Sequence, residues 1–142
     1  MATTTQITKT QNGLRIQAIF TIVVLVIQYA LGMVSNLFVQ FPQTDQANLL
    51  WAYARSQVPT FAHIMIGILL LVSAIVFVIR AIRNHDRGWI ASSVAGLVGI
   101  GIAIYGGVTY STIQVDLYSL VMALGFIVAF VAYGWGLIAA RK

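Results

Sequence analysis

Apolar residues are concentrated in four long stretches of the chain, separated by polar segments. The stretches are Ile16–Val39, Phe61–Ile79, Trp89–Tyr110 and Leu117–Ala140. An α-helix needs about 20 apolar residues to cross the hydrocarbon core of a bilayer, and each stretch is near or above this length. None of them alternates between polar and apolar residues, as the strands of a membrane β-barrel would. The pattern therefore predicts an all-α protein, an integral membrane four-helix bundle over residues 16–142.

The connection between the first two stretches, Gln40–Pro59, carries a helical pattern of its own. Thr44 or Asp45 can cap a helix whose body is Gln46–Gln57. We expect this helix, over about residues 45–57, to lie along the membrane surface. It would serve either as an interfacial anchor or as a lid over the bundle. Its apolar and aromatic residues are Leu49, Leu50, Trp51 and Tyr53.

The composition agrees with a membrane protein and excludes several other classes. The chain is 60% hydrophobic and 8% charged, with a mean hydropathy of +0.92, whereas soluble domains contain about 25% charged residues. A soluble enzyme domain and a disordered chain are both excluded. Cysteine is absent, which excludes disulfides, thiol catalysis, Cys-ligated zinc and iron–sulfur clusters.

The basic residues predict the orientation of the bundle. Seven of the eight flank the spans on one side, where Asp86 is the only acid, and Arg55 lies alone on the other side with Asp45 and Asp116. Positive charge favours the cytoplasmic side, so both termini and the polar tail, residues 1–15, are expected there, in the cell membrane. This collar favours anionic lipid head groups and requires no nucleic-acid partner. The seven residues are Lys9, Arg15, Arg80, Arg83, Arg87, Arg141 and Lys142.

Residues 1–12 are polar and are expected to be loosely ordered, because terminal segments without apolar periodicity have little to pack against.

Small residues recur at four-residue spacing in the third span and at three- or four-residue spacing in the fourth. Close helix approach in lipid depends on such residues, because lipid tails provide little hydrophobic force between helices. We therefore expect tight packing of both spans, either within one chain or against other membrane subunits or a second copy. The third span contributes the stripe Ala95, Gly99, Ala103 and Gly107, and the fourth contributes Gly125, Ala129, Ala132, Gly136 and Ala140.

Ionisable groups inside the spans are very few. No Asp, Glu, Lys or Arg lies well inside any span, and Glu is absent from the chain. This excludes small multidrug transporters, which depend on a membrane-embedded Glu, and the lack of cysteine excludes four-helix quinone-linked disulfide enzymes. The one intramembrane histidine is His63, whereas His85 lies in the basic connection. An ionisable residue inside a membrane is a functional candidate by default.

His63 suggests a haem site. Gly67 lies one turn away on the same helical face, where the missing side chain would let a flat macrocycle approach while the imidazole binds iron. Met122, about one turn into the fourth span, is a candidate second axial ligand. Arg55 could pair with haem propionates. The simpler interpretation is that His63 hydrogen-bonds a neighbouring side chain and that Met122 is a packing residue.

A second kind of pocket uses the same histidine without iron. Several polar and aromatic residues share its depth and could line a site for a lipid or a quinone. Gln28, nearer the bilayer centre, requires a hydrogen-bond partner inside the bundle. The candidate lining residues are Tyr29, Asn36, Tyr105 and Tyr118.

The four spans with a histidine on the second resemble one four-helix half of the haem A synthase family and, more loosely, other membrane b-type cytochromes. In that family, histidines on the second and fourth helices hold haem, which assigns His63 as one ligand by resemblance. The fourth span here has no histidine, so Met122 would substitute for it. Thr60 stands where an acidic residue accompanies the ligand in haem A synthase. The resemblance thus implies a haem-binding or degenerate relative rather than a haem-modifying enzyme.

Three functional hypotheses follow from these features. The preferred one is an accessory or structural subunit of a membrane complex, because reactive groups are few and small residues are abundant. The alternatives are a b-type haem protein that uses His63 for electron transfer or sensing, and a lipid- or quinone-binding module. An enzyme with its own acid–base groups is disfavoured, because the spans contain no carboxylate and one imidazole.

Overall fold

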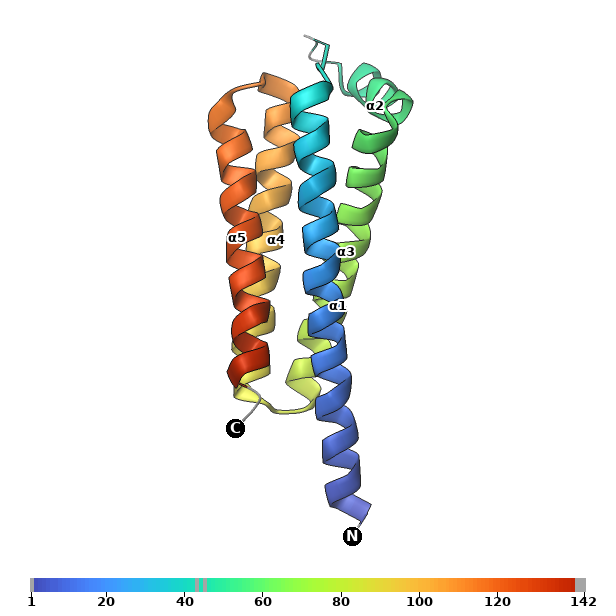
Figure 1. Cartoon of the computed structure of the whole chain (residues 1–142). Coiled ribbons are helices and arrows are strands. Elements are labelled where there is room, and N and C mark those ends of the chain that lie inside the picture. The colour runs from blue at the N-terminus through green and yellow to red at the C-terminus, as the bar shows by residue number, and fades with distance from the viewer. Residues whose placement is uncertain (1, 43, 45, 140–142) are drawn as a thin grey trace.

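The computed structural model describes residues 2–42, 44 and 46–139 and is entirely helical in its regular structure. Four long helices form an elongated bundle, and one short helix lies at one end of it (Figure 1). The helices are α1 (Ala2–Phe38), α2 (Ala47–Ser56), α3 (Val58–Arg83), α4 (Arg87–Ile113) and α5 (Asp116–Ala139).

The four long helices are the predicted membrane spans. Each contains a stretch long and apolar enough to cross a bilayer: Gln11–Phe38 of α1, and the whole of α3, α4 and α5. The prediction of a multi-pass, all-α membrane protein is confirmed. The last position of the predicted fourth span, Ala140, lies outside the described residues.

The bundle has two distinct ends. The α3–α4 connection lies at the same end as both termini, which we call the termini end (Figure 1). The α4–α5 connection and α2 lie at the opposite end, which we call the α2 end. Neighbouring helices in the ring are α1 with α3, α3 with α4, α4 with α5, and α5 with α1. The α4–α5 pair makes the most extensive contact of the four.

The short helix α2 lies in the connection where a helix over about residues 45–57 was expected, although its N-cap is Gln46 and not Thr44 or Asp45. It begins after Gln46 and packs on α3 through Leu50 and Ala54, which are buried. Its solvent-facing side includes Leu49 and Trp51, 49% and 39% exposed. An apolar strip that stays exposed at the end of a membrane bundle is the surface that a head-group layer would cover.

The N-terminal segment differs from expectation. Residues 2–12 were predicted to be loosely ordered, but α1 continues through them as a helix that extends past the bundle at the termini end (Figure 1). Adding residues to an existing helix costs far less than starting one, and the segment contains no proline. Gln11 also anchors it, because its side chain bonds both Asp86 and Trp89.

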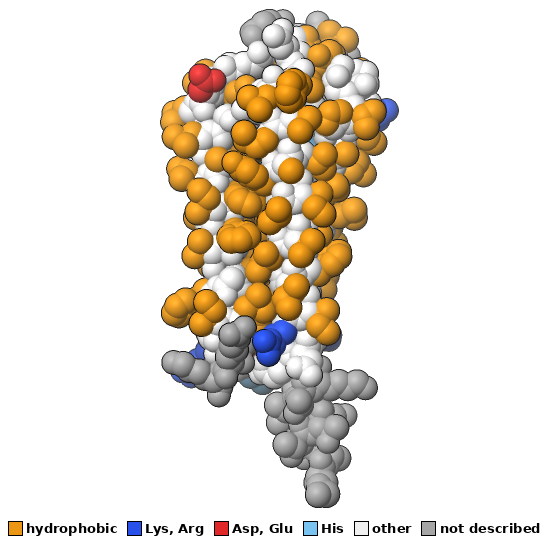
Figure 2. Space-filling view, in the orientation of Figure 1, with side chains coloured by type: hydrophobic (Ala, Val, Ile, Leu, Met, Phe, Trp, Pro, Cys, Tyr) orange, Lys and Arg blue, Asp and Glu red, His pale blue; other side chains and the backbone are white. Residues whose placement is uncertain are grey.

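The largest completely buried side chains lie toward the termini end. Phe77, Trp89 and Tyr133 are completely buried, and the Phe77 ring centroid lies 5.6 Å from that of Trp89 and 5.5 Å from that of Tyr133. Gly96 makes room for Tyr133, since a β-carbon there would come within 2.5 Å of the tyrosine ring. On the face shown in Figure 2, apolar side chains cover the length of the bundle and charged ones lie at its ends.

The small-residue stripe of α4 packs mainly within the chain. A β-carbon at Gly99 would lie 2.6 Å from the backbone nitrogen of Ala129, and one at Gly125 would meet the backbone of Ala103. Gly107 faces the Met122 sulfur. Of the predicted stripe, only Ala95 is exposed on the surface. The expected partner of this stripe is therefore chiefly α5 of the same chain.

Candidate functional site

His63 on α3 is bound to α1 by a reciprocal pair of hydrogen bonds. Its Nδ1 lies 3.0 Å from the backbone oxygen of Gln28, and the Gln28 side-chain Nε2 donates to the backbone oxygen of His63 at 2.8 Å. The expected intramembrane partner of Gln28 is thus the α3 backbone. Such interhelical bonds are favoured where no water competes for the polar groups.

Two glycines make this close approach possible. A β-carbon at Gly32 would lie 2.9 Å from Cε1 of His63, so the imidazole rests directly on the α1 backbone. A β-carbon at Gly67 would lie 2.9 Å from Nε2 of Gln28. The space beside Gly67, expected to receive a macrocycle, therefore receives the Gln28 amide.

The hydrogen bond of His63 determines its tautomer. A carbonyl oxygen can only accept, so Nδ1 must carry the proton that it donates to Gln28. In the neutral ring, Nε2 is then left with its lone pair. Nε2 makes no hydrogen bond within the described part of the chain. A backbone carbonyl on one nitrogen is the arrangement that commonly directs the other toward a metal or a donor.

Further polar groups lie on the same α1–α3 seam toward the α2 end. Thr60 donates to Ser35 at 3.2 Å, and both side chains are buried. The side-chain oxygens of Gln28 and Asn36 are enclosed and have no hydrogen-bond partner among the described residues. Together with His63 and Gly32 these residues form what we call the seam cluster. The two enclosed amide oxygens, of Gln28 and Asn36, could act only as hydrogen-bond acceptors.

The other expected haem residues lie elsewhere. Met122 packs on α4, where a β-carbon at Gly107 would lie 3.2 Å from its sulfur, and its backbone abuts Gly106. The Arg55 guanidinium lies 5.1 Å from the centroid of the Trp51 ring on α2, in a cation–π contact. In the described part of the chain, neither side chain forms a hydrogen bond or ring contact with His63.

The expected pocket tyrosines fall into two separate pairs. Tyr29 of α1 stacks on Phe126 of α5, with ring centroids 4.8 Å apart. Tyr105 of α4 meets Tyr118 of α5 edge to face, at 6.3 Å. The structure thus brings Gln28 to His63 and Tyr105 to Tyr118. The tyrosine ring contacts do not involve His63.

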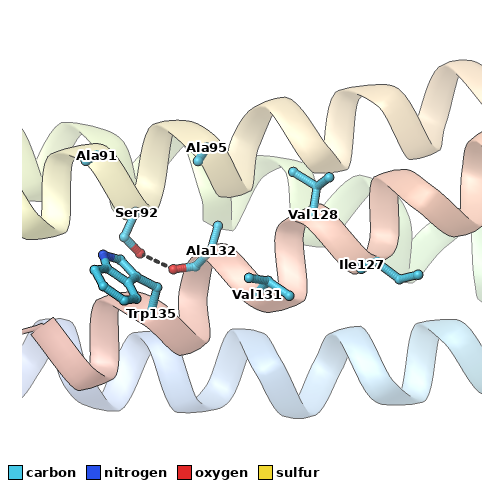
Figure 3. Close-up of a pocket in the computed structure, with 8 residues that line it drawn as sticks. All are labelled: Ala91, Ser92, Ala95, Ile127, Val128, Val131, Ala132 and Trp135. Carbon is cyan, nitrogen blue, oxygen red and sulfur yellow. Dashed lines mark hydrogen bonds between the residues drawn. The ribbon is translucent and has the colours of Figure 1, made fainter.

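An open groove runs along the outer surface between α4 and α5 (Figure 3). Its volume is about 560 Å³, and its lining is almost wholly apolar. Ser92 is buried and donates to the backbone oxygen of Ala132 at 2.7 Å, so its hydroxyl is already satisfied. We call this the α4–α5 groove; it is lined by Ala91, Ser92, Ala95, Ile127, Val128, Val131, Ala132 and Trp135.

The sequence contained only part of the signal for this groove. Ala91 and Ala95 lie one turn apart on α4 and are exposed, so small residues extend beyond the side that packs on α5. The walls come from a second helix, where Val131 and Trp135 are 61% and 63% exposed. A groove between two helices depends on their register, which a one-dimensional pattern does not specify.

The termini end carries a polar network around Asp86. Its carboxylate accepts from the Gln11 side chain at 2.8 Å and from the Trp89 backbone N–H at 3.1 Å, which caps α4. The Gln11 hydrogen bond holds the pKa of Asp86 below its ordinary value. Partial burial opposes this shift, and the backbone N–H groups of Trp89 and Gly88 reinforce it.

Within the described residues, no three His, Cys, Asp or Glu side chains gather as they would around a protein-bound metal ion. A haem iron needs only one or two protein ligands, so this finding concerns metal sites built from protein side chains alone.

No protein-family model matches the chain, and no curated protein or solved structure matches it either. The resemblance to the haem A synthase half therefore rests on topology and His63 alone.

Proposed function

We propose that this protein is an accessory subunit of a larger membrane complex and that it holds a transmembrane helix of its partner in the α4–α5 groove. The groove is the observation that carries the proposal. Association of helices in lipid relies on van der Waals contact and on small residues that let backbones approach. Ala91, Ala95 and Ala132 provide such a floor at the surface of the bundle.

The shape of the groove favours a partner over a second copy. A two-fold dimer uses the same patch on both subunits, so the patch must be self-complementary. The α4–α5 groove is concave, and a concave face is filled by a convex one such as a single helix. Its apolar lining suits a helix whose contacting side chains are also apolar.

Purification in a mild detergent tests this proposal. The wild-type protein is expected to co-purify with one membrane protein at a fixed ratio. Ala95→Phe fills the floor of the groove and should lower the recovered partner at least tenfold. Val76→Phe is the matched control, because Val76 is 44% exposed on α3, away from the groove. Equal recovery with both variants, or a complex containing only this chain, contradicts the proposal.

Haem binding at His63 is a second candidate, and the bond from Nδ1 to Gln28 favours it. That bond fixes the ring and leaves Nε2 as the nitrogen able to bind iron. The ligand nitrogen fits a haem, whereas the space at Gly67 is filled by Gln28. A bound b-type haem would supply one-electron chemistry, and His63 would hold it.

Absorption spectra of the purified protein, oxidised and reduced with dithionite, test this second candidate. A Soret band that is lost in His63→Ala and retained in His85→Ala supports it. His85 is the matched control, because it is exposed in the α3–α4 connection. Absence of a Soret band from wild-type protein supplied with haem excludes it.

A further inference from the structure

The termini end of the bundle bears a band of arginines at the edge of the apolar surface. Arg80 and Arg83 end α3 and Arg87 begins α4, and all three are exposed. Arg15 lies at the same end on α1 and is half-buried. We call Arg15, Arg80, Arg83 and Arg87 the arginine band. It lies where the apolar lengths of the spans stop, which is the level of lipid head groups.

The acid at this end does not neutralise the band. Asp86 directs its carboxylate to Gln11 and to the N-terminus of α4, as its bonds of 2.8 and 3.1 Å show. In the described part of the chain it forms no ion pair with the four arginines. Among the described residues, no carboxylate therefore neutralises their positive charge.

Arg80 is the most firmly positioned member of the band. Its guanidinium donates to the Gln17 side chain, and Gly13 leaves room for it, since a β-carbon at Gly13 would lie 2.9 Å from Nη2. The bond to Gln17 uses one of the five N–H donors of the guanidinium. A planar guanidinium held in place suits bidentate contact with phosphate oxygens.

We propose that the arginine band binds the phosphate groups of anionic lipids. Uncompensated charge at head-group level attracts anionic lipids, and a cluster of basic residues next to a membrane span is the arrangement that recognises them. The partner is a lipid head group and not free phosphate, because the band adjoins apolar surface that the acyl chains of the same lipid would cover. This inference is independent of the α4–α5 groove, which lies along the spans.

Native mass spectrometry of the full chain in a neutral detergent tests the proposal. Phosphatidylglycerol and phosphatidylcholine with the same acyl chains are added separately, and bound lipids are counted. We expect phosphatidylglycerol to bind at least tenfold more tightly at low salt. The double variant Arg83→Gln/Arg87→Gln should lose most of this preference. Arg55→Gln, at the α2 end, is the matched control and should keep it.

Two further measurements keep the test decisive. Arg80→Lys retains the charge but loses the planar fork, and we expect an intermediate preference. In wild-type protein, 500 mM NaCl should reduce the preference for phosphatidylglycerol. Inorganic phosphate should reduce this preference no more than sodium chloride of the same ionic strength does. Equal binding of the two lipids, an unchanged double variant, or displacement by millimolar inorganic phosphate at constant ionic strength would overturn the proposal.

Discussion

Gly99 and Gly101 lie two residues apart on α4 and have opposite surroundings. A β-carbon at Gly99 would come within 2.6 Å of the α5 backbone, whereas one at Gly101 would meet nothing within 4 Å. Gly99→Ala must therefore separate two backbones, at a cost of about 1–3 kcal/mol. Gly101→Ala should be neutral or stabilise by up to about 1 kcal/mol, because alanine favours a helix.

Unfolding of the two variants in mixed detergent micelles, followed by circular dichroism, checks this difference. The two substitutions add the same methyl group to the same helix, so each serves as the other's control. Equal shifts in the unfolding midpoint would mean that the α4–α5 contact at Gly99 is not as close as the structure has it.

The seam cluster illustrates how far residues can be interpreted from sequence. His63 stood out because it is the one histidine in a span, and Gln28 because a buried amide needs a partner. Their pairing was not predictable, since it depends on the rotation of α1 relative to α3. The role of Gly67 was uncertain for the same reason, because a glycine shows that something approaches without showing what does.

The capping of α4 by Asp86 leads to a prediction about pH. The pKa of Asp86 is lowered in the folded protein, chiefly by Gln11, from an ordinary value of 3.8. A lowered folded pKa means that the ionised carboxylate stabilises the fold. This contribution is fully present above pH 3.8 and is lost as the pH falls through the lower folded value.

Asp86→Asn isolates this contribution, because asparagine also caps helices but carries no charge. At neutral pH the ionised carboxylate should add to the stability of the wild type. This added stability should be lost only below about pH 4. The difference between wild type and variant, measured by thermal unfolding from pH 7 to pH 3, should follow this course. A difference that already declines between pH 6 and 5 would contradict the lowered pKa.

At the scale of whole elements, most of the fold was predictable. The four spans and the helical segment α2 were identified because hydropathy and helical periodicity are local properties of a segment, but the N-cap of α2 is Gln46 and not the expected Thr44 or Asp45. The helical N-terminal segment was not predicted, because its order depends on continuation from α1 and on the bonds of Gln11 to residues 75 and 78 positions away. Such long-range contacts leave no local pattern in the sequence.

The orientation of the whole molecule is a prediction that labelling can test. The arginine band should place the termini end in the cytoplasm. The chain contains no cysteine, so single cysteines can be introduced without background. Asn12 and Asn48 are both exposed, and they lie at the termini end and in α2 respectively.

A membrane-impermeant maleimide added to intact cells should label Asn48→Cys. Asn12→Cys should react only after the cells are permeabilised, and it serves as the matched partner of the first variant. Labelling of Asn12→Cys in intact cells would show that the bundle has the opposite orientation.

Whole-molecule packing explains why we propose the α4–α5 groove, and not the predicted stripe, as the surface for a partner. The small-residue stripe that was expected to mediate association packs largely against α5, where Gly99 and Gly125 bring the backbones together. Only the edge of that small-residue surface, at Ala91 and Ala95, opens outward. The function proposed for the protein therefore depends on a feature that exists only once the helices have packed.

Photo-crosslinking from the groove in native membranes is the most direct test of this account. A crosslinking amino acid at Val131, in the groove, should form one discrete adduct with another membrane protein, which mass spectrometry identifies. Adding Ala95→Phe should abolish that adduct. The same crosslinker at Val76, on the outer face of α3, should give no protein adduct. If Val131 behaves like Val76, or links only to a second copy of this chain, the α4–α5 groove does not hold a partner helix.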